Sequence, residues 1–282
     1  MSSTFNHESV RKLVTFWLLF VLSLAVTACE AKEASIPATT ALPATLIGTW
    51  QVAGAKIDTS ATRTTYYQRN DPRLTGRLFV ITSQKLTVNI PPSDQCNNPK
   101  ARIIRATAAE LFKNSMGGDS PTPKDYEFPL AENAPVEVLT LYCDEGLLGG
   151  HVGIDGGIMG AWIVILSKDQ LAIHWSDETI LLLNRLPSNT KPIASFSCNK
   201  AVTTVEKTIC SSVALAAYDQ SVAQAYNDTA KYFNEAGNAD ALVQLKTSQK
   251  QWLTQRNACG SDATCLEKAM VDRLEVIQTS LQ

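Results

Sequence analysis

The stretch AWIVILSKDQLAIHWSDETILLLNR, residues 161–185, holds three short apolar runs separated by two polar connections. The connections, SKD at 167–169 and SDE at 176–178, have the length and polarity of β-hairpin loops. Strands joined by such loops run antiparallel to one another. We therefore expect three strands of an antiparallel meander, at 161–166, 170–175 and 179–185.

Upstream of this stretch, further short β-branched runs alternate with turn residues. Between them, 108–114 is suited to one or two helical turns. Seven or eight strands with little helix can hide their edges by closing into a barrel, and a sandwich is the competing architecture. We expect this β domain to cover residues 46–187, with its earlier strands at 50–57, 77–82, 85–90, 101–105 and 136–143.

The pattern changes after the segment between Pro187 and Pro192, where we place a domain boundary. Thr203 and Glu206 form a capping box that opens a short helix, and apolar residues then recur at spacings of three and four. The sequence thus predicts an α+β protein of two domains. An antiparallel β-barrel-like (or sandwich) domain is followed, over 195–282, by a disulfide-stapled all-α helical hairpin domain.

The N-terminus has the pattern of a secretory leader over residues 1–28. Arg11 and Lys12 precede an uncharged apolar stretch of sixteen residues, 13–28, which is short for a membrane span of about 20 residues. The leader ends in VTAC, which resembles the lipobox of bacterial lipoproteins and implies that Cys29 is lipidated. An uncleaved signal anchor is the alternative. Residues 29–45, rich in Ala, Thr and Pro, would form a flexible tether.

This leader predicts a lipid-anchored protein of the cell envelope. Glu30, rather than Asp, follows the lipidated cysteine, and the resemblance to lipoproteins implies sorting to the outer membrane, facing the periplasm. The membrane is then a partner through the lipid anchor alone.

The chain has seven cysteines, an odd number for an oxidising compartment. If lipid modifies Cys29, six remain, and an even set in a secreted protein indicates disulfides. Cys96 and Cys143 lie in the β domain. The other four allow local pairs, 198–210 and 259–265, or crossed pairs between helices: Cys198, Cys210, Cys259 and Cys265.

The helical segment carries a spaced set of polar, aromatic and cysteine residues. Besides its four cysteines, these are Glu206, Asp219, Gln249, Trp252, Arg256 and Arg273. The set resembles the LprI-type lysozyme-inhibitor domain. The resemblance implies an all-helical, disulfide-stapled envelope module that is associated with binding and inhibiting lysozyme. We therefore expect a protein partner, either lysozyme or a related envelope hydrolase.

The same six residues have a binding and a structural interpretation. They could form a binding face. Alternatively, Trp252 fills the hairpin core and Arg256 pairs with Glu206 or Asp219, because a half-buried charge needs a partner. Charge does not favour the inhibitor interpretation: residues 188–282 hold nine basic and nine acidic side chains, whereas lysozymes are commonly basic and complementary charge speeds association.

In the β domain, Gly48-Thr49-Trp50 resembles the Gly-x-Trp signature of lipocalins, with Arg185 as the basic residue over the tryptophan. The resemblance implies an up-and-down barrel holding one small apolar ligand or lipid. In the alternative, Trp50 is an ordinary core residue at the start of a strand.

Other functions find little support in the sequence. A net charge of −2 provides no basic surplus for nucleic acid. Motifs of hydrolases, metalloproteases and phosphate loops are absent from the sequence, so we expect no enzyme, no cofactor and no metal. His151, Asp155 and His174 are the candidates for a metal or catalytic site.

Overall fold

The computed structural model describes residues 39–58, 60, 65–91, 95–117, 121–147 and 161–281. The chain divides into two units, Met1–Ile36 and Pro37–Gln282, and the description concerns the second. The predicted leader 1–28, the lipidation site Cys29 and the two candidates His151 and Asp155 lie outside the described residues. Among the described residues, no helix has the length and apolarity needed to cross a membrane.

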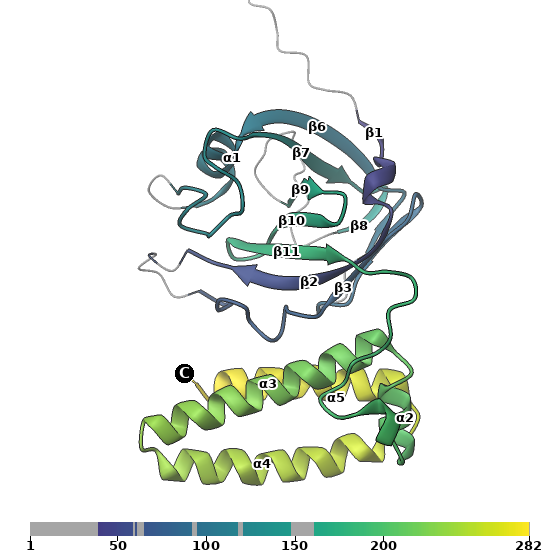
Figure 1. Ribbon diagram of the computed structural model, residues 1–282, viewed down its shortest axis with the longest axis vertical. Helices are drawn as coiled ribbons and strands as arrows, with labels where there is room; N and C mark the ends of the chain where they lie inside the picture. The colour runs from purple at the N-terminus through teal and green to yellow at the C-terminus, as the bar shows by residue number, and fades with distance from the viewer. Residues whose placement is uncertain are drawn as a thin grey trace, which may run out of the picture. The chain divides into compact units, whose positions relative to one another are not determined.

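Residues 40–185 build one antiparallel sheet (Figure 1), which we call the β region. The strand order is β1-β6-β7-β9-β10-β11-β2-β3-β4-β5-β8. A 3-10 helix, Ala44–Leu46, precedes β2, and the helix α1 (Ala108–Ser115) follows β6. The strands are β1 (Thr40–Ala41), β2 (Gly48–Lys56), β3 (Leu78–Ile81), β4 (Lys85–Val88), β5 (Gln95–Asn97), β6 (Lys100–Thr107), β7 (Pro135–Tyr142), β8 (Glu145–Leu147), β9 (Trp162–Ser167), β10 (Gln170–Trp175) and β11 (Thr179–Arg185).

The sheet curls because the strands at its two ends are continuous along the chain. β5 runs into β6 along the chain and β7 runs into β8, while β5 pairs with β8 and β6 with β7. β11 pairs with β2, which joins the last strand to the start of the meander. The predicted antiparallel fold is therefore confirmed, as a barrel-like curled sheet and not as a sandwich of two sheets.

The bend of this ribbon requires a glycine. Gly146 has φ of +91°, and a Cβ there would lie 2.0 Å from the carbonyl oxygen of Gln95, so a side chain does not fit. The Cys96–Cys143 disulfide lies at the same bend. The short strands β5 and β8 were not predicted, because three residues are too few to show alternation.

The β region has a buried core on each side of β9 and β10. Inside the curl lie large side chains such as Trp50, Phe79 and Trp175. On the outer side, α1 and the following segment cover the sheet with Phe112 and Tyr126. Burial on both faces explains why 161–185 is nearly continuous in apolar residues.

The first strand lies earlier than expected. β1 pairs with β6 through Thr40 and Ala41, and Leu46 is fully buried. The expectation of a flexible tether over the whole of 29–45 is therefore wrong at its C-terminal end, where an edge of β6 and the core provide partners.

Residues 195–281 form the helical region. It comprises a 3-10 helix (Cys198–Lys200) and helices α2 (Thr204–Ile209), α3 (Val213–Glu235), α4 (Ala239–Ala258) and α5 (Ala263–Thr279). Each α-helix begins at a side chain that accepts a backbone N–H, namely Thr203, Ser212, Asn238 and Asp262. The prediction of a disulfide-stapled all-α part is confirmed, and α5 adds a third long helix that packs on both members of the α3–α4 hairpin.

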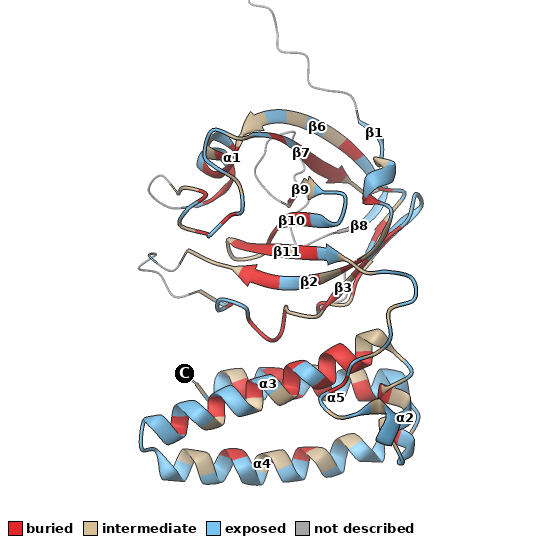
Figure 2. Cartoon of the chain, in the orientation of Figure 1, coloured by how far each residue is buried: buried red, intermediate tan, exposed pale blue. Residues whose placement is uncertain are grey.

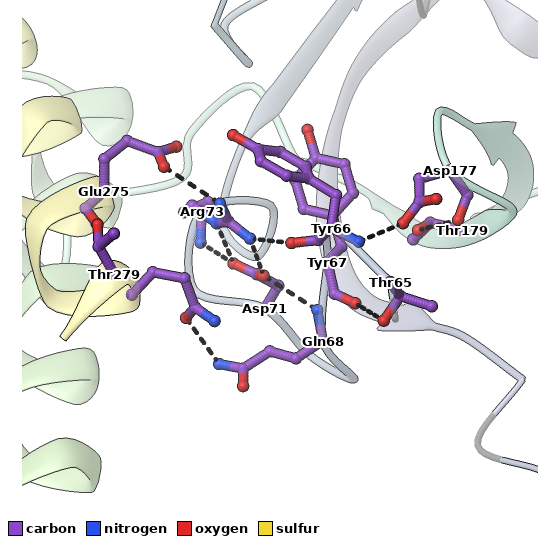
Figure 3. Close-up of polar contacts among 11 residues, drawn as sticks. Thr65, Tyr66, Tyr67, Gln68, Asp71, Arg73, Asp177, Thr179, Glu275 and Thr279 are labelled. Atoms are coloured by element: carbon purple, nitrogen blue, oxygen red, sulfur yellow. Dashed lines mark hydrogen bonds and ion pairs between the residues drawn. The ribbon is translucent and has the colours of Figure 1, made fainter. Parts of the chain in front are cut away.

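The β and helical regions contact each other through the segment before β3. Figure 3 shows Arg73 held by Asp71 and by Glu275 of α5, with N–O distances of 2.8 and 3.1 Å. The guanidinium of Arg77 lies 3.3 Å from the ring centroid of Tyr218, and its Nη2 donates to Ser221 Oγ at 2.8 Å. The sequence provided no signal for these contacts, which join residues far apart in the chain.

Candidate functional site

Asp219 of α3 is the centre of a buried polar cluster. Only 4% of its surface is exposed, and its carboxylate accepts from the backbone N and Oγ of Ser195 at 2.8 and 2.6 Å. Arg256 of α4 completes the cluster, with Nη1 3.2 Å from Asp219 Oδ1. Burial lowers the pKa of Arg256, and the negative charge of Asp219 acts against that shift. Of the two partners considered for Arg256, the structure has Asp219 as the ion-pair partner.

Glu206 caps the N-terminus of α2 and does not pair with Arg256. Its carboxylate accepts from the backbone N of Val202 and of Thr203, each at 2.9 Å, which completes the capping box of α2. These backbone hydrogen bonds, that of Thr203 first, hold the pKa of Glu206 below its usual value. Glu206 therefore stabilises the start of a helix.

Trp252 links α4 to α5. Its indole Nε1 donates to the carbonyl oxygen of Ala269 at 2.9 Å, and the guanidinium carbons of Arg256 and Arg273 lie 5.1 and 6.0 Å from its ring centroid. Arg273 is buried and donates from Nε to Gln249 Oε1 at 2.8 Å. Burial lowers the pKa of Arg273.

The disulfides of the helical region are local. Cys198 pairs with Cys210, which ties the 3-10 helix to the end of α2, and Cys259 pairs with Cys265, which ties the end of α4 to the start of α5. Spacing alone had allowed crossed pairs as well. Together with the polar contacts above, these bridges place the six spaced residues in the scaffold of the helical region, each with an intramolecular partner.

Most of α4 is accessible to solvent. Only Leu245 and Trp252 of this helix are buried, and Figure 2 shows most of α4 as exposed or intermediate. Its outward residues recur at helical spacing and are small or polar, apart from Val243, which is 62% exposed. We call this surface the outer face of α4: Asp240, Val243, Thr247, Lys250, Gln251 and Thr254.

The lipocalin-like residues of the β region also have structural partners. Trp50 Nε1 donates to the carbonyl oxygen of Leu46 at 2.8 Å, and Arg185 lies 4.0 Å above the Trp50 ring. Arg185 also donates to the carbonyl oxygens of Ile47 and Lys168. A Cβ at Gly48 would lie 2.5 Å from Arg185 Nη1, and φ of Gly48 is +145°. The Gly-x-Trp pattern thus places an arginine over the base of the curl.

His174 is the one candidate for metal or catalytic chemistry that the structure describes. Its ring stacks on Trp162 with a centroid distance of 5.6 Å, and its Nε2 lies 3.9 Å from Glu178 Oε2. Across the described ranges, no three His, Cys, Asp or Glu side chains gather as metal ligands would. His174 therefore packs as part of the outer core of the β region.

The comparison with protein families agrees with the helical region. Residues 197–279 match the family model "Lysozyme inhibitor LprI", which covers α2 to α5 and all six spaced residues. The resemblance expected for this segment is confirmed. The curled sheet agrees with a lipocalin-like body only in its general architecture. Comparisons with curated proteins and with solved structures give no match.

Proposed function

We propose that this chain is an envelope lipoprotein whose helical region binds and inhibits a lysozyme or a related wall-cleaving hydrolase. The observation that carries the proposal is the match of residues 197–279 to a lysozyme-inhibitor family. The predicted leader and Cys29 support an anchored, periplasm-facing protein, for which a wall hydrolase is a natural target. In this view the β domain, expected over 46–187, begins earlier with β1, and the helical domain covers 195–282.

The surface that contacts the partner is assigned by excluding the surfaces that already make contacts within the protein. The six family-type residues hold helices together, and α3 and α5 provide the contacts to the β region. The outer face of α4 remains accessible over most of the helix. We therefore assign partner binding to this face, with Val243 as its apolar contact.

Charge supports a two-part recognition of a basic hydrolase. Residues 188–282 are neutral, whereas residues 29–187 hold 17 acidic and 14 basic side chains. Long-range attraction would come from this acidic excess and the short-range contact from α4. Association should then slow as salt is added, because screening shortens the range of the attraction.

The binding test uses the chain from Glu30 onwards, without the leader and the lipidated cysteine. Lysozymes of several types are titrated with it, and complex formation and wall lysis are measured together. We expect a stable complex and loss of lysis. If every lysozyme stays fully active and forms no complex, the inhibitor function is wrong.

A matched pair of variants tests the assigned face. Val243→Arg places a bulky positive charge on α4, and Val276→Arg does the same at an exposed valine of α5. We expect Val243→Arg to weaken binding at least tenfold, an order typical of a lost hot-spot contact, and Val276→Arg to leave binding unchanged. If Val276→Arg weakens binding and Val243→Arg does not, the interface lies on α5.

Anchoring is tested separately. Cells expressing the full chain are labelled with a radioactive fatty acid, and the label on the wild type is compared with that on Cys29→Ala. We expect label on the wild type alone. Equal label on both variants would contradict lipidation at Cys29.

The carrier function gains no support from the described core. The inside of the curl is occupied by fully buried side chains, among them Trp50, Phe79 and Leu86. We therefore do not propose a lipid or small apolar ligand for this protein.

A further inference from the structure

Arg102 of β6 is a partly buried arginine without a counter-charge. Within the described part of the chain, its Nε and Nη1 are buried and have no hydrogen-bond partner. Its contact is with the ring of Tyr142, whose centroid lies 4.8 Å from the guanidinium carbon. Taking a charge out of water costs free energy unless a partner replaces the water.

Two hydroxyl groups beside Arg102 are also unpartnered. Thr140 of β7 lies directly opposite Arg102 in the sheet register, is 4% exposed, and has a buried Oγ1 without a partner in the described structure. The buried OH of Tyr142, two residues further along the same strand, lacks one there as well. Arg102 and Thr140 are directly opposed, and Tyr142 lies two residues from Thr140 on the same strand. Because side chains alternate between the faces of a strand, all three lie on one face of β6 and β7.

The carboxylates nearest along these strands are already paired with other bases. Glu137 pairs with Arg105 at 3.3 Å, and Asp144 pairs with Lys100 at 3.0 Å. On the other side of Thr140 lies Trp162, whose Nε1 donates to Ser115 Oγ at 2.9 Å. The neighbours on the described strands therefore leave the donors of Arg102 unused.

Three other arginines in the described chain have paired guanidinium groups, whereas Nη1 of Arg77 is also buried without a hydrogen-bond partner. Arg73 pairs with two carboxylates, Arg256 pairs with Asp219, and Arg185 donates to backbone carbonyls. A guanidinium flanked by two hydroxyls, all unpaired, is a set of donors matched to an oxyanion. Each orphaned buried polar group calls for a partner.

We infer that Arg102, Thr140 and Tyr142 form a binding site for a small oxyanion, a carboxylate or a phosphate group. The guanidinium supplies the positive charge and the two hydroxyls donate hydrogen bonds to the anion's remaining oxygens. The site lies in the β region and does not depend on the proposed inhibition of lysozyme.

The test is calorimetric titration of the chain from Glu30 onwards with inorganic phosphate and, separately, with acetate. The buffer contains no other phosphate or carboxylate. Arg102→Met keeps the aliphatic stem and removes the charge, and Arg105→Met is the matched control on the same strand. Charge-assisted hydrogen bonds make a loss of roughly tenfold or more in affinity the expected effect of Arg102→Met, with no change for Arg105→Met.

The two titrations distinguish the sources of the oxyanion. Binding of phosphate alone identifies a phosphoryl group as the ligand, and binding of acetate alone identifies a carboxylate. If neither anion binds the wild type saturably, or if Arg102→Met binds as tightly as the wild type, the inference is wrong.

Thermal unfolding provides a second readout. Without anion, Arg102→Met and Thr140→Val should unfold at the wild-type temperature or above it, because each removes an unsatisfied buried group. With a saturating anion, the wild type should gain stability that Arg102→Met does not gain. A lower unfolding temperature for Arg102→Met without anion would make Arg102 a structural residue and overturn the inference.

Discussion

The β region and the helical region are held together by different means. In the β region, eleven strands pair in one curled sheet, with a core of large apolar side chains inside it and a second core under α1. In the helical region, α4 contributes only Leu245 and Trp252 as buried residues. There, two disulfides and a few buried polar contacts supplement a smaller core.

This difference explains where the family resemblance is found. A core made of many interchangeable apolar residues leaves little fixed pattern in the sequence. A fold that depends on Asp219, Arg256, Trp252, Arg273 and four cysteines leaves a spaced and specific one. The residues that identify the helical region are thus those that hold it together.

The largest expected effect is the loss of Asp219. In Asp219→Ala, Arg256 and the donors of Ser195 lose their carboxylate, and leaving a buried charge unpaired costs about 3–5 kcal/mol. Chemical unfolding followed by circular dichroism at 222 nm should show this loss in the helical region. Asp228→Ala, an exposed position on the same helix, is the control. Equal stabilities for the two variants would mean that the polar cluster does not hold the helices.

The three disulfides should stabilise the protein to different extents, because they close loops of different length. Cys96–Cys143 spans 47 residues, Cys198–Cys210 spans 12 and Cys259–Cys265 spans 6. Chain entropy then predicts losses of about 4, 3 and 2 kcal/mol for the respective double alanine variants. Unfolding in denaturant measures each loss. If removal of Cys198–Cys210 costs more than removal of Cys96–Cys143, the helical region depends on its bridges beyond loop entropy.

The ion pair between the β and helical regions should contribute less to stability than the disulfides do. In Glu275→Ala, Arg73 keeps Asp71 as its partner and loses one partly exposed carboxylate, so we expect a loss of about 1 kcal/mol or less. The informative readout is cooperativity, measured by near-ultraviolet and far-ultraviolet signals in one unfolding series. Two separate transitions in the variant and one in the wild type would show that this ion pair couples the regions. Lys268→Ala, at an exposed ion pair on the same helix, should leave the transitions unchanged.

The smallest effect concerns pH. The pKa of Glu206 is lowered in the folded protein by hydrogen bonds from the backbone of Thr203 and Val202. Its stabilising contribution is therefore complete above the unfolded value of about 4.3 and is lost as pH falls through the lower folded value. Glu206→Gln should weaken the acid dependence of unfolding below about pH 4.5. An unchanged acid dependence would mean that the cap of α2 does not contribute to it.

Much of the fold follows from local patterns. The strands β9 to β11 were predicted because two polar hairpin loops divide an apolar stretch, and α2 because Thr203 and Glu206 form a capping box. β5 and β8 were not predicted, since each has three residues and owes its place to the bend at Gly146.

Less of the candidate site could be predicted. The sequence predicted Glu206 or Asp219 as the partner of Arg256, and only the three-dimensional arrangement shows that Asp219 forms the ion pair. Arg73 contacts a residue 202 positions away and Arg77 one 144 positions away, and no local pattern encodes such contacts. The unpaired Arg102 could not be predicted either, because only the register of β6 and β7 shows that it lies beside Thr140.

Inhibition is tested most directly by lysis of cell-wall substrate by purified lysozymes in the presence of the chain from Glu30 onwards. We predict that at least one type of lysozyme is inhibited with saturation at one chain per enzyme. We also predict that Val243→Arg relieves this inhibition at an unchanged unfolding temperature. Undiminished lysis by every lysozyme type, with a folded chain in molar excess, would show that the protein is not a lysozyme inhibitor.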